Sequence, residues 1–188
     1  MPTPMHEAAW HTFSEIFGLW HNAQESRLLP AGGGTVEGST RRKTPDTSWR
    51  SSIKPPRRDS RWPTIVADVG WSETWAKLRE DARFWLCESN QQVNVALTIK
   101  VTKKGNITIE KWDVTTNTGG VEPIQTMRIS RKRRTGPNQY HISGSIDIPF
   151  QDCFLRAKRG NETDFRLSND NLKSIAEAVR ESMSWRSG

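Results

Sequence analysis

Two aspartates, Asp46 and Asp68, stand where they could hold a metal ion. Asp46 follows Pro45 at the end of a basic loop, and Asp68 lies inside the apolar run 64–70. An aspartate within an apolar strand is costly unless it is paired, solvated or bound to a cation. Two carboxylates at the end of a sheet can hold Mg²⁺ (or Mn²⁺), which polarises a phosphodiester. A hydrogen bond from Asp68 to a neighbouring loop is the structural alternative.

The pattern of apolar residues predicts the elements that position this pair. Residues 63–69 are expected to form a central strand in which Asp68 points away from the main apolar side. A short edge strand within 47–53 precedes it, so that Asp46 can meet Asp68 across adjacent strands. Ser72 is expected to cap a helix over 72–86. In this helix, Lys77 and Arg79 are expected to be solvated, and the buried face is expected to comprise Trp75, Leu78, Ala82, Trp85 and Leu86.

The rest of the chain supplies further helices and strands. Its apolar spacing predicts helices at 5–23, 152–155 and 169–183 and strands at 93–101, 106–114, 123–131 and 140–150. This order predicts one α/β (α+β) domain over residues 1–188, with a mixed central sheet flanked by helices.

The charge of the chain favours a polyanionic partner. The formal net charge is +7, and the excess is concentrated in a basic, proline-rich loop at about 50–62 and a basic loop at about 131–138, with further cations just before the first. A solvated loop or a nuclear-localisation patch is the alternative for the second loop. The cations expected to bind nucleic acid are Arg41, Arg42, Lys43, Arg57, Arg58, Arg131, Lys132, Arg133 and Arg134.

Cysteine usage and hydropathy indicate where the protein acts. Its two cysteines, Cys87 and Cys153, have no metal-binding spacing and are expected to be free thiols. No secretory signal and no apolar run of membrane-spanning length is visible. We therefore expect an intracellular protein of the nucleus or cytoplasm, with no membrane partner.

Three sequence blocks resemble a known superfamily. They run over 43–49, 62–73 and 78–86, and the likeness continues through Ile109-Glu-Lys-Trp112, Ile148-Pro-Phe150 and the last helix. Together they are similar to a group of fungal proteins in the PD-(D/E)XK nuclease superfamily. The resemblance covers nearly the whole chain. It implies the restriction-endonuclease-like fold and a magnesium-dependent nuclease that hydrolyses phosphodiester bonds in DNA.

The resemblance also implies roles for individual residues. Asp46 and Asp68 match the two acidic halves of the motif, and Glu7 matches the acidic residue that many members carry on the first helix. The motif lysine belongs two residues after Asp68, where this chain has Gly70. Arg83 matches a basic residue that has migrated into the following helix, as it has in some members, and Lys100 is the next candidate. On spacing alone, Glu7 would belong to a solvated helix face.

Three functions are compatible with the sequence. The first is a metal-dependent nuclease, as many members of this fold are, and such a nuclease can be a homodimer. The second is a degenerate module that binds nucleic acid without cutting it, because the motif lysine is missing. The third, suggested by nine tryptophans, is a domain that binds other proteins.

Overall fold

A mixed sheet of seven strands forms the centre of the computed structural model, which describes residues 3–32, 34–71, 74–115, 119–131 and 140–184. The strand order is β1-β4-β5-β6-β7-β8-β9; β5 and β6 run parallel, and all other neighbours are antiparallel. These strands are β1 (Leu28–Pro30), β4 (Thr47–Ser51), β5 (Ile65–Trp71), β6 (Val95–Val101), β7 (Ile107–Val114), β8 (Val121–Arg131) and β9 (Tyr140–Gly144). The predicted α+β class with a mixed central sheet is confirmed.

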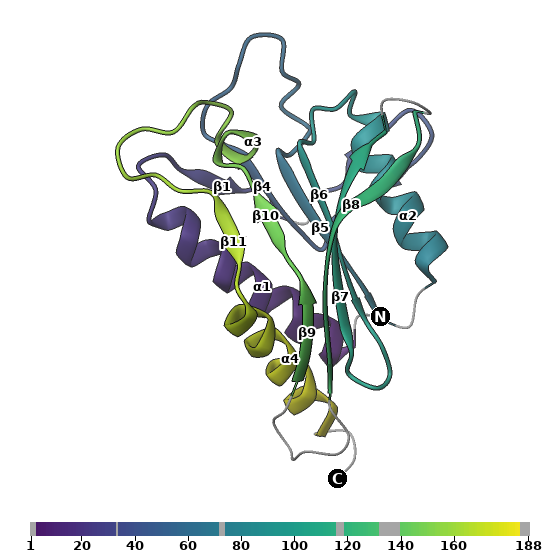
Figure 1. Ribbon diagram of the computed structural model, residues 1–188. Helices are drawn as coiled ribbons and strands as arrows, with labels where there is room; N and C mark the ends of the chain where they lie inside the picture. The colour runs from purple at the N-terminus through teal and green to yellow at the C-terminus, as the bar shows by residue number, and fades with distance from the viewer. Residues whose placement is uncertain (1–2, 33, 72–73, 116–118, 132–139, 185–188) are drawn as a thin grey trace.

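Two long helices cover one face of the sheet and one shorter helix covers part of the other (Figure 1). The first face carries α1 (Pro4–Asn22) and α4 (Asn169–Ser184), and the second carries α2 (Trp75–Arg83) with a π-helical segment, η1 (Phe84–Glu88). The remaining elements are β2 (Val36–Glu37), β3 (Arg42–Lys43), β10 (Ile146–Ile148), α3 (Phe150–Phe154) and β11 (Phe165–Leu167).

Strand alternation divides the sheet into an apolar face and a more polar face, which also carries a smaller apolar cluster under α2 and η1. On β6, Leu97 and Ile99 point into the main core with α1 and α4, whereas Thr98 and Lys100 point to the face of α2. Asp68 pairs with Thr98 in the parallel ladder and therefore shares the polar face. This is the division that the alternating residues predict.

Three predicted elements differ from the structure. The strand expected at an edge within 47–53 is β4, which lies inside the sheet because β1 pairs with its outer side. The helix after β5 begins at Trp75 with Thr74 as its N-cap, whose hydroxyl accepts a hydrogen bond from the Lys77 amide at 3.2 Å. The cap expected at Ser72 falls outside the described residues. The predicted strand 140–150 is two strands, because Gly144 adopts a φ of +80° and any Cβ there would collide with the carbonyl oxygen of Thr126. The chain turns there and leaves the central sheet.

No helix in the described ranges combines the length and the hydropathy needed to cross a membrane.

Candidate functional site

The structure brings Asp46 and Asp68 to neighbouring strands. Thr47 pairs with Ala67 in the antiparallel ladder of β4 and β5, so Asp46 stands one step before that pair and Asp68 one step after it. The Asp46 carboxylate accepts a hydrogen bond from the backbone N–H of Val69 at 2.7 Å. The two carboxyl groups therefore both lie beside the segment 67–69 of β5.

Asp68 is buried, with only 4% of its surface exposed. Its Oδ2 accepts a hydrogen bond from the indole Nε1 of Trp85 at 2.7 Å and lies 3.0 Å from Nζ of Lys43. Burial raises the pKa of the Asp68 carboxyl, and the nearby charge of Asp46 raises it further, whereas Lys43 and Trp85 oppose that shift. The cost of burying this carboxylate is thus offset by one cation and one N–H donor.

Lys43 links Asp68 to a second buried aspartate. Its Nζ lies 3.2 Å from Asp81 of α2, which is also 4% exposed, and its side chain passes over the ring of Trp85. We call Lys43, Asp68, Asp81 and Trp85 the buried charge cluster. Because its members come from β3, β5, α2 and η1, the cluster fastens the outer helix to the sheet.

The position of the missing motif lysine is closed by packing. A Cβ built on Gly70 would lie 3.1 Å from both methyl groups of Leu78 on α2. Contacts this close require the Leu78 side chain to shift by a few tenths of an ångström, and a side chain longer than alanine would have to displace Leu78 further. Glycine at this position is what allows α2 to pack directly on β5.

Glu7 reaches Asp46 only through a histidine. His6 Nε2 lies 3.3 Å from Oδ2 of Asp46, and His6 Nδ1 lies 3.6 Å from Glu7. The hydrogen bond to Asp46 is the main cause that raises the pKa of His6. Glu7 also accepts a hydrogen bond from the indole of Trp10 at 2.8 Å. The three expected acidic groups are therefore arranged in a row, with His6 between Glu7 and Asp46.

The donor set fits a magnesium ion poorly in this arrangement. Mg²⁺ keeps several water molecules when carboxylates bind it, but Asp68 is buried and contacts an ammonium group and an indole. In the described part of the chain, no group of three or more His, Cys, Asp or Glu side chains is placed to hold a metal ion. The charge of Asp68 is already neutralised by Lys43, a side chain of the protein itself.

The two basic candidates from the sequence do not take the place that Lys43 occupies. Arg83 lies exposed at the end of α2. Lys100 stands beside Gly70 in the β5–β6 ladder, but its ammonium group lies over the ring of Trp75, 4.4 Å from the ring centre. The cation beside the aspartates is thus one that the sequence assigned only to nucleic-acid binding.

Several cations expected to bind nucleic acid are held within the protein. Arg41 lies 3.1 Å from the aspartate of α2 in the buried charge cluster, and Arg42 pairs with a glutamate of β2 at 3.2 Å. Arg58 donates to backbone carbonyl groups, including that of Gln92, and burial lowers the pKa of its guanidinium. The contacts of Arg41 and Arg58 give these two arginines a role in holding the fold, whereas the Arg42–Glu37 pair is exposed on both sides and contributes little.

Other members of that set are exposed or cannot be placed. Arg57 and Arg131 are exposed to solvent. Lys132, Arg133 and Arg134 lie outside the described residues.

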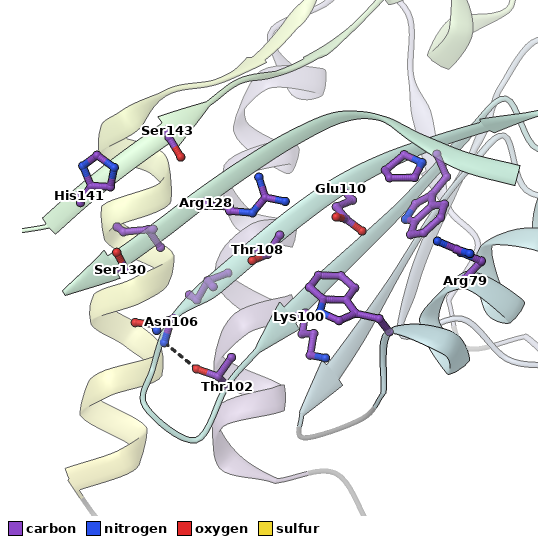
Figure 2. A pocket seen from close by; sticks show the side chains of 15 residues that line it. Arg79, Lys100, Thr102, Asn106, Thr108, Glu110, Arg128, Ser130, His141 and Ser143 are labelled. Atoms are coloured by element: carbon purple, nitrogen blue, oxygen red, sulfur yellow. Dashed lines mark hydrogen bonds between the residues drawn. The ribbon is translucent and has the colours of Figure 1, made fainter. Parts of the chain in front are cut away.

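A second group of polar side chains surrounds a cavity on the same face of the sheet, beside α2. The cavity has a volume of about 820 Å³. Its lining includes Arg79 from α2, Lys100 from β6, Arg128 from β8 and His141 from β9, as Figure 2 shows. We call this cavity and its lining the basic groove. Lys100 and Arg128 share one row across the sheet, because each pairs with Thr108 of β7.

Two arginines of the basic groove are free to bind a ligand. Within the described residues, the guanidinium groups of Arg79 and Arg128 make no hydrogen bond and no ion pair, and both side chains are exposed. Trp75 also lines the groove and is 41% exposed, although its spacing predicted a buried position. An exposed indole beside unpaired guanidinium groups is typical of sites that hold nucleic acid.

One acidic residue lies among these cations. Glu110 of β7 is 6% exposed and lines the basic groove; Figure 2 shows it between Arg128 and Arg79. Burial raises the pKa of its carboxyl, and the charges of Arg128, Arg79 and Lys100 oppose that shift. No described residue forms a hydrogen bond or an ion pair with the Glu110 carboxylate, which is therefore available to a ligand with N–H donors.

Sequence reasoning missed three features of this face. It treated Arg79 as a solvated residue, it gave Glu110 no role, and it did not place Lys43 beside the aspartates. The alternation of 106–114 against 93–101 contained a signal for the groove, since it sets Glu110 and Lys100 on one face. No local signal pointed to Lys43, whose partners lie at least 25 residues away in sequence.

No known protein-family model matches the chain, and no curated protein sequence is significantly similar to it.

Proposed function

We propose that this protein is a nucleic-acid-binding module with a restriction-endonuclease-like fold that holds its ligand in the basic groove without cutting it. The observation that carries the proposal is that the guanidinium groups of Arg79 and Arg128 bind no described residue. They lie around one cavity together with Lys100 and the exposed indole of Trp75. Cations bind backbone phosphates, and aromatic rings stack on bases.

The arrangement of elements supports the fold assignment. A helix is followed by three antiparallel strands, β1, β4 and β5, and α2 then connects β5 to the parallel strand β6. Asp46 immediately precedes the second of these strands and Asp68 lies on the third, and both match the acidic halves of the motif in the superfamily that the sequence resembles. That superfamily acts on nucleic acids, which agrees with the net charge of +7.

The buried charge cluster argues against cleavage. Lys43 and Trp85 occupy Oδ2 of Asp68, and Leu78 covers the position of the motif lysine. A divalent ion at Asp68 would have to displace the Lys43 ammonium group. The cluster therefore acts as an internal substitute for a metal ion and holds the fold together.

Binding to single- and double-stranded DNA by fluorescence anisotropy, over a series of salt concentrations, tests the proposal. Each phosphate contact contributes about 0.7–0.9 to the slope of log K against log salt. The double variant Lys100→Gln/Arg128→Gln should reduce that slope by about 1.4–1.8 units. Lys173→Gln, which removes an exposed cation from α4 on the opposite face, serves as the matched control. Equal slopes for all three proteins, or no binding at low salt, would refute the assignment.

A metal-dependent nuclease is the second candidate, and the proximity of Lys43 to Asp68 favours it. A lysine ammonium group 3.0 Å from Asp68 is the kind of group that the motif lysine supplies from Gly70 in related nucleases. If Mg²⁺ or Mn²⁺ binds Asp46 and Asp68, Lys43 must first move away from its present contact.

Cleavage and binding measured on the same samples separate the two candidates. The wild-type protein and Asp68→Asn are incubated with DNA and Mg²⁺ or Mn²⁺, and retention of the DNA is measured in parallel. We expect binding by both and cleavage by neither. Cleavage by the wild type alone would establish the nuclease, and the size of the complex in solution would then show whether it acts as a homodimer.

A further inference from the structure

We infer that the basic groove selects a single-stranded nucleic acid through an unpaired guanine, whose N1–H and N2–H groups donate to the carboxylate of Glu110. This inference rests on the proposed function and adds the preferred ligand. It draws on Glu110, which is the one acidic side chain among the described residues that line the groove, on its lack of a partner there, and on the exposed indole nearby.

Glu110 is an acceptor without a donor. Its side chain is more than nine-tenths buried, and within the described residues it makes no hydrogen bond and no ion pair. A largely buried carboxylate of this kind is costly unless water or a ligand in the groove supplies donors. A carboxylate offers two acceptor oxygens side by side. Of the four DNA bases, guanine presents two adjacent N–H donors on its Watson–Crick edge, which match that spacing.

The neighbouring cations fit the rest of such a ligand. The charges of Arg79, Lys100 and Arg128 reach Glu110 from three different elements, so phosphates on either side of the guanine can meet a cation. A phosphate alone would be repelled by Glu110, whereas a base that donates to it is not. The groove therefore has one acidic contact for a base and three cationic contacts for a backbone.

Trp75 supplies a surface for stacking. Its ring is 41% exposed at the start of α2, and the Lys100 ammonium group lies over it at 4.4 Å from the centre. This cation–π contact orients the indole while leaving part of it open. Stacking on such a ring stabilises binding of any base, so Trp75 contributes affinity and Glu110 contributes the choice of base.

The ligand must be single-stranded for a chemical reason. In a duplex, N1–H and N2–H of guanine are engaged by cytosine and cannot reach Glu110. The cavity of about 820 Å³ is within the range of roughly 300–1,000 Å³ that small-molecule sites occupy, which suits one or two nucleotides rather than a double helix.

The test uses oligothymidylates of nine nucleotides whose central base is guanine, adenine, cytosine or thymine. Their affinities are measured by fluorescence anisotropy at low salt. We expect the wild-type protein to bind the guanine oligonucleotide roughly tenfold more tightly than those with adenine, cytosine or thymine, as a bidentate contact implies. Hypoxanthine, which lacks the 2-amino group, should bind with intermediate affinity. This comparison needs no variant protein.

Two variants then locate the contact. Glu110→Gln should lose the guanine preference, with a ratio near 1. The adenine, cytosine and thymine oligonucleotides should bind at least as tightly as before because a negative charge is gone, whereas the guanine oligonucleotide loses its bidentate contact. Glu177→Gln, which removes a carboxylate from the opposite face on α4, should keep the preference. Trp75→Ala should weaken all oligonucleotides by roughly fivefold or more and preserve the order of the bases.

The outcomes distinguish this inference from the proposed function. If wild-type protein binds all four oligonucleotides equally, the inference fails while nucleic-acid binding stands. If Glu110→Gln keeps the guanine preference, the carboxylate is not the contact and the inference also fails. If no oligonucleotide binds at low salt, the proposed function itself is wrong.

Discussion

Replacing Lys43 by methionine should destabilise the protein far more than a typical loss of a charged side chain. Methionine keeps most of the length and the apolar stem but removes the ammonium group that lies 3.0 Å from Asp68 and 3.2 Å from Asp81. Asp81 retains two other cations, Arg41 at 3.1 Å and Lys77 at 3.3 Å. The loss therefore falls mainly on Asp68.

The structure sets the size of this effect. Asp68 is 4% exposed, and two contacts stabilise its charge. Without the Lys43 ammonium group, only the hydrogen bond from Trp85 remains. Removing one partner of a buried ion pair costs about 3–5 kcal/mol. Because the Lys43 side chain is 14% exposed and one hydrogen bond remains, we expect a decrease of about 3 kcal/mol in the free energy of unfolding at neutral pH.

Urea denaturation at several pH values is the assay. Arg42→Met is the matched control, because Arg42 adjoins Lys43 on β3 and forms an exposed pair with Glu37; it should cost less than about 1 kcal/mol. The deficit of Lys43→Met should shrink as the pH falls, because burial raises the pKa of Asp68 and the folded protein takes up a proton there more readily than the unfolded chain.

A double variant isolates the pair. Lys43→Met/Asp68→Asn should recover part of the stability lost in Lys43→Met, because the uncompensated charge is gone. A cost below about 1 kcal/mol for Lys43→Met, as in a surface pair, would refute the conclusion that Lys43 neutralises Asp68. A cost that does not change between neutral and acidic pH would refute the assignment of the effect to that carboxylate.

Three other perturbations test separate parts of the fold. Gly70→Ala should lower the free energy of unfolding by about 1–3 kcal/mol, because a Cβ there presses on the leucine of α2. Gly18→Ala, in open space on α1, should instead raise it by up to about 1 kcal/mol. Thermal unfolding that ranks the two variants the other way would contradict the packing at Gly70. Arg156 lowers the pKa of Glu162 to about 2, so the stability from this pair is present above about pH 4.5 and is lost as the pH falls toward 2; Glu162→Gln should flatten that part of the pH profile, and an unchanged profile would refute the pairing. Burial raises the pKa of the Cys153 thiol, so it should react with a disulfide reagent only after unfolding; rapid reaction of both thiols in the native protein would show that its environment is more open.

The core strands and the pair of aspartates could be predicted because their signals are local. Alternation at 93–101 fixes which side chains of β6 enter the core, and an isolated Asp68 in an apolar strand indicates a polar contact. Strand pairing then places Asp46 opposite it without further information. Apolar and polar residues alternate with a period of two in any strand that buries one face, whatever the tertiary arrangement, so this signal can be recognised from the sequence alone.

The partner of Asp68 could not be predicted, for a physical reason. Lys43 lies on a strand of two residues, β3, whose direction depends on its contacts with β2. Its ammonium group reaches an aspartate on β5 and another on α2, and no periodicity relates these positions. The exposure of Trp75 has a similar origin, because the helix begins at Trp75 and its first turn projects beyond the core.

The packing of the first helix against the last has a consequence for synthesis on the ribosome. Phe13 and Phe17 of α1 share one apolar core with Ile175 and Val179 of α4, which are separated from them by nearly the whole chain. Until α4 has emerged, the apolar face of the completed sheet is only half covered. We therefore expect nascent chains that end before 169 to expose this face and to depend on chaperones.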